Sequence, residues 1–320
     1  MSWTQRPEGG SRFALWLIRS IALSCGRPVG RVLLYPITLY FLLVRGPERR
    51  ASRAYLARVL GRPATLMEVA RHMHAFASTI LDRVFLLSGR FKGFDLQVEG
   101  LDMLHEHMAQ GRGVLLVGSH HGSFESLRVL SLERPDAVVR VVLDKGQNPA
   151  ITQLLEALNP EVARTVIDAG QDGTAIVLAI REATEQGALV GMLADRARPG
   201  EPARPCRFLG APAPFPTAPW LIASVLDVPA ILCFGLYRGG NRYSLHFELF
   251  SERVSIPRKN RAQALEEIQQ AYADRLEHYV RLAPYNWFNF YDFWQGGGDA
   301  ADARSHGGAG PGAAVGDGQR

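Results

Sequence analysis

From residue 95 to residue 250, short apolar runs alternate with helix-like segments, and this alternation constrains the fold more than any other feature. The runs are rich in Val, Ile and Leu and end in Gly, Asp or Ser, as expected for buried strands. The strand candidates are residues 95–99, 114–117, 138–143, 165–167, 189–193, 230–236 and 243–250, and the helix candidates between them are residues 151–158, 175–186 and 219–226. This order predicts an α/β fold with a mostly parallel central sheet flanked by helices.

Composition divides the 320-residue chain into three regions. Residues 1–92 form a predicted helical, membrane-associating region, because residues 48–90 show helical spacing and apolar runs precede them. Residues 93–295 form the predicted α/β core, which ends with a helix over residues 264–282. Residues 296–320 are mostly Gly, Ala, Asp and Ser, and we expect them to be disordered because such a segment cannot bury enough apolar surface.

The N-terminal region raises the question of a membrane anchor. The apolar run Val32–Val44 has 13 residues and contains Pro36, and arginines such as Arg31 and Arg45 flank it. A helix that crosses a bilayer needs about 20 apolar residues. The run therefore favours an interfacial or re-entrant anchor whose arginines and aromatic side chains lie at the headgroup level. The alternative is a helical cap packed on the core.

Charge limits the classes of partner that the chain can bind, and cysteine content limits its disulfides and its compartment. The net charge is +5 and the sequence pI is about 9.3, and the arginines are dispersed beside apolar stretches. This placement suits an anionic membrane surface or an acidic carrier protein better than DNA, so we expect no nucleic-acid partner. The three cysteines, Cys25, Cys206 and Cys233, are widely spaced. Their spacing predicts neither a disulfide framework nor a zinc site, and it fits a reducing compartment.

The strongest candidate for chemistry follows the strand candidate at 114–117. There Gly118 and Ser119 precede His120, and Glu125 comes five positions after it. Imidazole has an ordinary pKa near 6.5 and can take a proton from a hydroxyl, and a carboxylate can orient it. We predict that His120 is a general base and that Glu125 orients it. In the alternative, His120 is a structural residue and Glu125 only begins a helix.

Polar residues also follow two other strand candidates. Asp195 and Arg196 come after residues 189–193, and Lys145 and Asn148 come after residues 138–143. In a parallel sheet these ends meet at one edge, where basic side chains bind phosphate or stabilise an oxyanion. We predict that all four residues bind substrate. A local ion pair is the alternative for Asp195 and Arg196.

Two further segments flank the predicted site. Residues 208–219, with four prolines, predict a loop that forms a lip over an apolar cleft or else a plain connector. Residues 284–294 are densely aromatic. We expect Trp287 and Phe290 to close the core, although such a segment can also line a lipid site. His72 and His74 are predicted to be ordinary helix residues.

Together these motifs resemble the bacterial lipid A biosynthesis acyltransferases, a family within the lysophospholipid acyltransferase superfamily. The resemblance covers about residues 10–295. It rests on the spacing of His120 and Glu125, the Asn148-Pro149 pair, the Asp195-Arg196 pair and the 208–219 segment, which occur in that order. Its nearest likeness is to the branch associated with aryl polyene and xanthomonadin-type pigment genes.

The resemblance implies an enzyme at the cytoplasmic face of the inner membrane. It implies transfer of a fatty acyl group from an acyl-carrier-protein or coenzyme A thioester to a lipid hydroxyl, with no cofactor, no metal and no covalent acyl-enzyme. Many lipid A members have arginine before the Asn-Pro pair where Asp144-Lys145 stand here, and Asp-Gln where Asp195-Arg196 stand. These departures point to an acceptor other than lipid A.

Two other functions remain open at the level of sequence. One is a noncatalytic lipid-binding protein on the same scaffold, and the other is an acyl-thioester hydrolase in which water replaces the acceptor. The chain has no Gly-X-Ser-X-Gly elbow and no nucleotide-binding glycine pattern, which argues against a serine hydrolase and against nucleotide-dependent chemistry.

Overall fold

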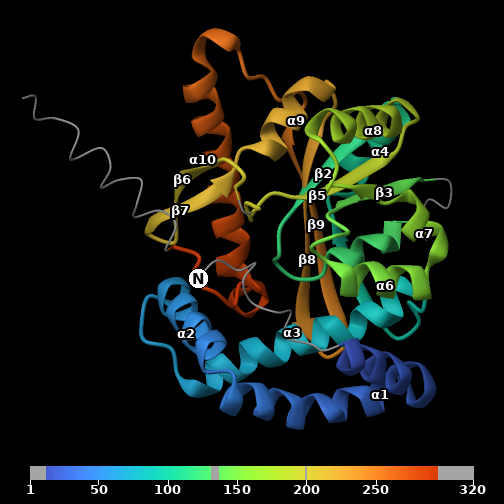
Figure 1. Cartoon of the computed structure of the whole chain (residues 1–320), viewed down its shortest axis with the longest axis vertical. Helices are drawn as coiled ribbons and strands as arrows, with labels where there is room; N and C mark the ends of the chain where they lie inside the picture. Colours follow the sequence, from blue (N-terminus) through green and yellow to red (C-terminus); the bar gives the residue numbers. More distant parts are fainter. Residues whose placement is uncertain (1–11, 131–136, 199, 295–320) are drawn as a thin grey trace, which may run out of the picture.

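A seven-stranded sheet forms the centre of the computed structural model, which describes residues 12–130, 137–198 and 200–294 (Figure 1). The strand order is β1-β9-β8-β2-β5-β3-β4. Every neighbouring pair is parallel except β8 and β9, so the predicted fold class is confirmed. The strands are β1 (Asp95–Glu99), β2 (Val114–Gly118), β3 (Val139–Leu143), β4 (Ile167–Asp168), β5 (Leu189–Leu193), β8 (Ala230–Gly239) and β9 (Arg242–Ser251). The predicted tail at 296–320 lies outside the described residues.

Helices surround this sheet, and those that were predicted lie close to their predicted positions (Figure 1). One predicted strand, residues 165–167, is largely replaced, because helix α7 continues to Thr165 and leaves only the two residues of β4. The helices are α1 (Arg12–Val44), α2 (Gly46–Leu60), α3 (Leu66–Leu87), α4 (Leu101–Ala109), α6 (Pro149–Leu158), α7 (Pro160–Thr165), α8 (Gly173–Glu185), α9 (Ala218–Leu226) and α10 (Arg261–Leu282), with short 3₁₀ turns η2 (Phe124–Val129), η3 (Arg258–Asn260) and η4 (Pro284–Asn286).

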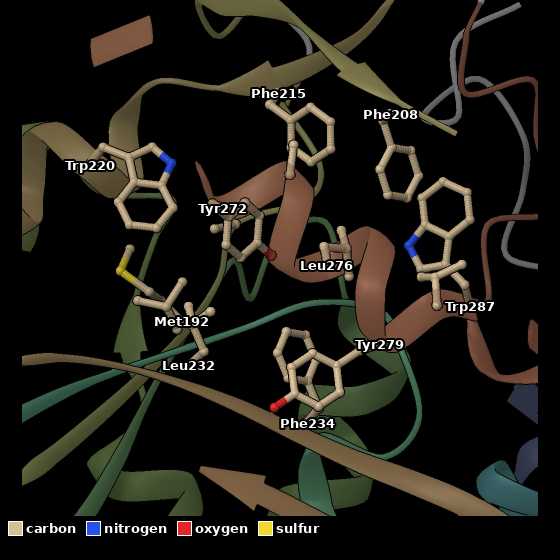
Figure 2. Close-up of a cluster of buried hydrophobic side chains, with 14 of the residues drawn as sticks. Met192, Phe208, Phe215, Trp220, Leu232, Phe234, Tyr272, Leu276, Tyr279 and Trp287 are labelled. Atoms are coloured by element: carbon tan, nitrogen blue, oxygen red, sulfur yellow. The ribbon is translucent and has the colours of Figure 1, made fainter. Parts of the chain in front are cut away.

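The strands are apolar on both faces because both faces are covered. Along β2, Leu115 and Val117 belong to one buried cluster, whereas Val114 and Leu116 belong to a second. This alternation follows from the two-residue period of a strand. In Figure 2 the α10 side chains Tyr272, Leu276 and Tyr279 face residues of the sheet in the first cluster. Helix α10 therefore closes that face of the sheet.

The predicted loop at 208–219 is wrong for most of its length. Strands β6 (Ala203–Phe208) and β7 (Ala211–Pro216) form a separate antiparallel ribbon, and helix α9 follows. Prolines are tolerated there because each strand of a two-stranded ribbon has an unpaired edge. Phe208 and Phe215 are fully buried. The ribbon is thus part of the core and not an open lip.

Helix α1 lies along α3 (Figure 1). Gly26 has φ +79°, which interrupts the helix, and the continuous part is Gly26–Val44. This 19-residue segment is long and apolar enough to cross a membrane. The 13-residue run Val32–Val44 therefore underestimated the length of the apolar helix. Gly30 packs against Leu81 of α3. Eight large apolar residues of this segment are exposed: Val29, Val32, Leu33, Tyr35, Leu39, Tyr40, Leu43 and Val44.

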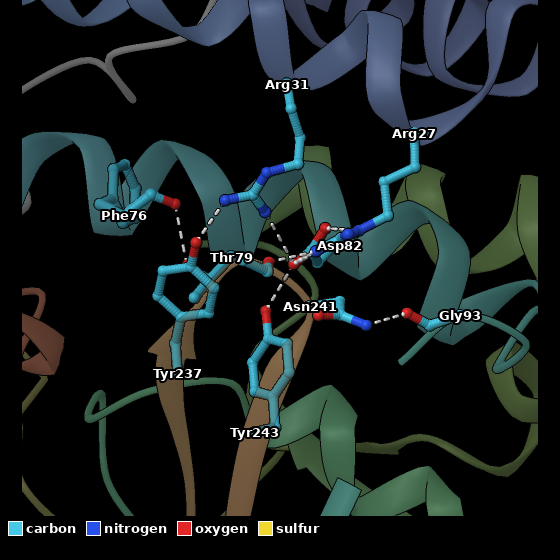
Figure 3. A network of polar contacts seen from close by, with 10 residues as sticks. Arg27, Arg31, Phe76, Thr79, Asp82, Gly93, Tyr237, Asn241 and Tyr243 are labelled. Atoms are coloured by element: carbon cyan, nitrogen blue, oxygen red, sulfur yellow. Dashed lines mark hydrogen bonds and ion pairs between the residues drawn. The ribbon is translucent and has the colours of Figure 1, made fainter. Parts of the chain in front are cut away.

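A buried carboxylate fastens α1 to the rest of the fold, and we call this contact set the Asp82 network (Figure 3). Arg27 donates to both oxygens of Asp82, at 2.7 and 2.8 Å. Arg31 lies 3.6 Å from Asp82 Oδ2, and Tyr243 of β9 donates to the same oxygen at 2.9 Å. The network therefore joins α1, α3 and the sheet through one side chain.

Candidate active site

The loop after β2 holds His120 at the carboxyl edge of the sheet. The Gly122 and Ser123 amides donate to the carbonyls of Asn286 and Gly235, both at 2.8 Å. The His120 carbonyl accepts from the amide of Phe288 at 2.9 Å. Gly122 has φ +82°, and a Cβ there would lie 2.1 Å from the Gly235 oxygen. The loop is therefore fixed by backbone contacts that require glycine at this position.

Asp195 is the carboxylate that contacts His120. It follows β5, which pairs directly with β2. Its Oδ1 lies 2.8 Å from His120 Nδ1 and also accepts from the His120 amide at 3.1 Å, while Trp287 Nε1 donates to Oδ2 at 3.4 Å. Because a carboxylate only accepts, Nδ1 carries the proton in the neutral ring. Nε2 then holds the free lone pair, and no described residue hydrogen bonds to it.

Electrostatics keep this pair in the form that a base requires. Burial raises the pKa of Asp195, but His120 and Arg196 outweigh it and lower that pKa to about 2. Burial and the charge of Arg196 lower the pKa of His120 below its ordinary value of 6.5, more than Asp195 raises it. Near neutral pH the site therefore combines an ionised carboxylate with a neutral imidazole, one third of which is exposed.

Glu125 does not take the orienting position predicted for it. Its Oε1 lies 2.7 Å from Nε of Arg83 on α3, and its Oε2 accepts from Ser123 Oγ at 3.2 Å. The residues after the loop form the 3₁₀ turn η2, which directs Glu125 toward α3 while Asp195 approaches from the neighbouring strand. The partner of His120 thus comes from across the sheet.

Arg83 is a site residue that the sequence reasoning missed. Its charge lowers the pKa of His120, as does that of Arg196. The one signal was the Asp82-Arg83 pair inside the otherwise apolar stretch from Ile80 to Leu87. Charged residues are almost never fully buried unless they are paired, so a charged pair in an apolar stretch indicates partners inside the fold.

Arg196 contacts the C-terminal aromatic segment. Its Nη2 donates to the Phe288 carbonyl at 2.7 Å, its Nε donates to Asn289 Oδ1, and its guanidinium lies over the ring of Tyr291. Trp287 is fully buried between Asp195 and Phe208. The segment at 284–294 therefore closes the core, as expected for Trp287 and Phe290, and it also forms a wall of the site.

Lys145 and Asn148 lie one strand further along, after β3. The Lys145 amide donates to Asp168 Oδ1 at 3.2 Å, and Asn148 precedes α6 with its Nδ2 donating to the Asp144 carbonyl at 3.0 Å. No contact between described residues joins either of them to His120. Their substrate-binding role stays a prediction.

The site offers a base but no thiolate. Cys206 and Cys233 are buried, and burial raises the pKa of the Cys206 thiol to about 12 and that of Cys233 further. Neither thiol is ionised near neutral pH. Among the described residues, no group of three or more His, Cys, Asp and Glu side chains is arranged to hold a metal ion. The chemistry that these residues themselves supply is proton abstraction at His120.

Comparison with known proteins agrees with this arrangement. The family model described as bacterial lipid A biosynthesis acyltransferase matches residues 62–295, more than two thirds of the chain. No curated protein gives a significant match. The matched region contains α3, the whole sheet and the aromatic segment. The chain therefore belongs to the bacterial lipid A biosynthesis acyltransferase family.

Proposed function

We propose that this chain is a membrane-associated O-acyltransferase that moves a fatty acyl group from an acyl thioester to a hydroxyl of a lipid or glycolipid. The observation that carries the proposal is the 2.8 Å contact between His120 Nδ1 and Asp195, which leaves Nε2 free to accept a proton. A neutral imidazole backed by an ionised carboxylate is suited to deprotonating a hydroxyl at the moment it attacks.

The reaction proceeds by direct transfer. The acceptor hydroxyl oxygen attacks the thioester carbonyl carbon, and its proton passes to His120 Nε2. In the next step the new carbon–oxygen bond is kept and the carbon–sulfur bond breaks. The protonated His120 then donates its proton to the leaving sulfur. Asp195 stabilises the imidazolium between these steps. The high thiol pKa values of Cys206 and Cys233 support direct transfer over a thioester intermediate on the protein.

Two arginines are available for the charge that develops on the substrate. The attacked carbonyl oxygen becomes an oxyanion, and cations held in place before the reaction lower the energy of that state. Arg83 and Arg196 both act electrostatically on His120. The ion pair of Arg83 with Glu125 uses Nε, so the outer nitrogens of Arg83 remain available for an oxyanion or an acceptor phosphate.

The membrane is the source of the acceptor in this proposal. The exposed apolar side of α1 supplies an anchor, and the net charge of +5 favours an anionic bilayer and an acidic acyl donor such as an acyl carrier protein, with acyl-CoA as the other thioester. We place the protein at the cytoplasmic face of the inner membrane. The departures at Asp144-Lys145 and Arg196 favour an acceptor other than lipid A, such as an aryl polyene glycolipid.

Acyl transfer by membranes containing His120→Ala tests the proposal. Labelled acyl-carrier-protein and acyl-CoA are supplied in parallel with total lipid extract, and His278→Ala, an exposed histidine on α10, is the matched control. We expect transfer to fall by at least about 100-fold in His120→Ala and to persist in the control. Free fatty acid formed without acceptor would support a hydrolase. Lipid binding without turnover by the unmodified chain would support the noncatalytic reading.

A further inference from the structure

A cavity of about 710 Å³ lies where α1 meets the end of α3, apart from the residues around His120. Three phenylalanines and three basic residues line it. The lining consists of Arg27, Phe85, Gly89, Arg90, Phe91, Lys92 and Phe94. None of these residues has a role in the proposed acyl transfer. Their combination of aromatic rings and cations suits a ligand that is partly apolar and partly anionic.

The inner cation of the cavity is Arg27, which belongs to the Asp82 network (Figure 3). Its guanidinium lies 4.7 Å from the centre of the Phe94 ring, and its Nη2 also donates to the Gly240 carbonyl at 2.6 Å. Asp82 faces Arg31 as well as Arg27. One carboxylate thus meets two guanidinium groups, and this end of the cavity keeps a net positive charge.

The outer cations are Arg90 and Lys92, on the turn after α3. Both are exposed, and neither side chain makes an ion pair or hydrogen bond with any described residue. The turn itself is held, because the Arg90 amide donates to the Phe85 carbonyl at 2.9 Å and Asn241 donates to the Gly93 carbonyl at 2.6 Å. Two cations without a partner among the described residues therefore extend from a fixed backbone turn at the cavity.

We propose that this cavity binds one anionic phospholipid, with the phosphate at Arg90 and Lys92 and the glycerol and upper acyl chains against Phe85, Phe91 and Phe94. The volume lies within the range of about 300–1,000 Å³ typical of ligand sites. The exposed apolar residues Val29 and Val32 follow Arg27 on α1. A lipid in the cavity would thus continue the apolar face that faces the bilayer. The inference rests on the membrane association proposed above.

The chain contains three lysines, which permits a direct footprint. Lys92 lines the cavity, Lys145 follows β3, and Lys259 is exposed on η3, just before α10. The full chain is treated with an amine-reactive reagent, and modification of each lysine is quantified by mass spectrometry. The probes are short-chain phosphatidylglycerol below its micelle concentration, short-chain phosphatidylcholine, inorganic phosphate and coenzyme A.

We expect phosphatidylglycerol to slow the modification of Lys92 at least about threefold and to leave Lys259 unchanged, with little effect from phosphatidylcholine or phosphate. Equal protection of Lys92 and Lys259 would reduce the effect to general surface binding. Protection by coenzyme A but not by phosphatidylglycerol would assign the cavity to the acyl donor. No protection by any probe would overturn the site.

Vesicle partitioning gives the second measurement. Arg90→Ala/Lys92→Ala removes two charges at the cavity, and Arg258→Ala/Lys259→Ala removes two exposed charges on η3. On phosphatidylglycerol vesicles the first variant should bind roughly 10- to 30-fold more weakly than the unmodified chain, and the second should change little. Similar losses in both variants would contradict a specific site. Because no acyl donor is present, these results do not depend on whether the chain is an acyltransferase.

Discussion

At the scale of single residues, the role of His120 depends on which carboxylate contacts it. Asp195 is buried and hydrogen bonds to Nδ1, whereas Glu125 pairs with Arg83. We predict that Asp195→Asn lowers kcat by about 10²-fold or more, because an amide can present its NH₂ group to Nδ1 and favour the wrong tautomer. Glu125→Gln should cost less. Measured kcat values for both variants check this order, and an equal or larger loss in Glu125→Gln would restore Glu125 as the orienting residue.

The pH dependence of transfer follows from the same residues. A general base acts in its neutral form, and the pKa of His120 is lowered below 6.5 by burial and by Arg196. We therefore expect kcat/KM to rise with pH, with the midpoint of the rise below pH 6.5. Arg83→Gln removes a charge that lowers this pKa, so its acidic limb should move to higher pH. A limb that moves to lower pH, or not at all, would contradict the placement of Arg83 beside His120.

Sequence reasoning singled out His120 but not the carboxylate that contacts it, for a physical reason. A histidine after a buried strand is visible because the strand pattern places it at the sheet edge. Which carboxylate contacts His120 depends on which strands pair, and the local sequence does not predict that β2 pairs with β5. Spacing alone pointed to Glu125, but η2 turns that side chain toward α3. Residue pairs across a sheet are set by topology, not by distance along the chain.

At the scale of elements, the loop after β2 depends on close backbone packing. A Cβ on Gly122 would meet the Gly235 oxygen at 2.1 Å, and the φ of +82° is itself unfavourable for other residues. We predict that Gly122→Ala destabilises the fold by at least about 2 kcal/mol and lowers transfer further by displacing His120.

Gly61→Ala is the control for this loop. Gly61 also has a positive φ, +67°, but nothing lies within 4 Å of its Cβ position. The Gly61→Ala substitution should lower the free energy of unfolding by about 1 kcal/mol and leave the activity of the folded protein unchanged. Thermal and denaturant unfolding of both variants measure the difference. Equal costs would mean that the contact with Gly235 is not needed to hold the loop.

The Asp82 network makes the attachment of α1 testable. Asp82 is fully buried and serves Arg27, Arg31 and Tyr243. We expect Asp82→Asn to lower the free energy of unfolding by about 3 kcal/mol, because it leaves two partly buried guanidinium groups without their counter-charge. Tyr243→Phe removes one hydrogen bond and should cost about 1–2 kcal/mol. Faster proteolysis within α1 in Asp82→Asn would locate the effect, and unchanged proteolysis would exclude a fastening role.

Elements were predictable where one pattern dominated. Strands with β-branched apolar runs and helices with three- and four-residue spacing were found within a few residues. The β6-β7 ribbon was not predicted, because its prolines are the usual sign of a loop. Prolines are compatible with extended structure there because the two strands are edge strands that pair with each other. The length of α1 was underestimated because Arg27 and Arg31 interrupt its apolar run, and the structure pairs both of them with Asp82.

At the scale of the whole molecule, the contacts of α1 bear on how the proposed anchor would lie on a bilayer. Arg27 and Arg31 near one end of Gly26–Val44 are tied to Asp82, and Thr38 nearer the other end contacts His74 at 3.1 Å. The segment thus lies against α3 over most of its length. A helix crossing the bilayer in this position would carry α3, with its buried polar contacts, into the hydrocarbon. We therefore favour an orientation in which α1 lies in the plane of the membrane and its exposed apolar side faces the hydrocarbon.

Labelling from one side of the membrane distinguishes the two orientations. Cysteines are introduced one at a time at the exposed positions Ser24 and Arg50, which precede and follow Gly26–Val44, in a chain with Cys25→Ser, while the buried Cys206 and Cys233 stay as internal references. For α1 in the membrane plane, a membrane-impermeant maleimide should label both positions in inside-out vesicles and neither in intact spheroplasts, because both ends face the cytoplasm. A spanning helix would expose one end in each preparation. That result would require α1 to separate from α3, and the Asp82 network would then be a contact of the protein outside the membrane only.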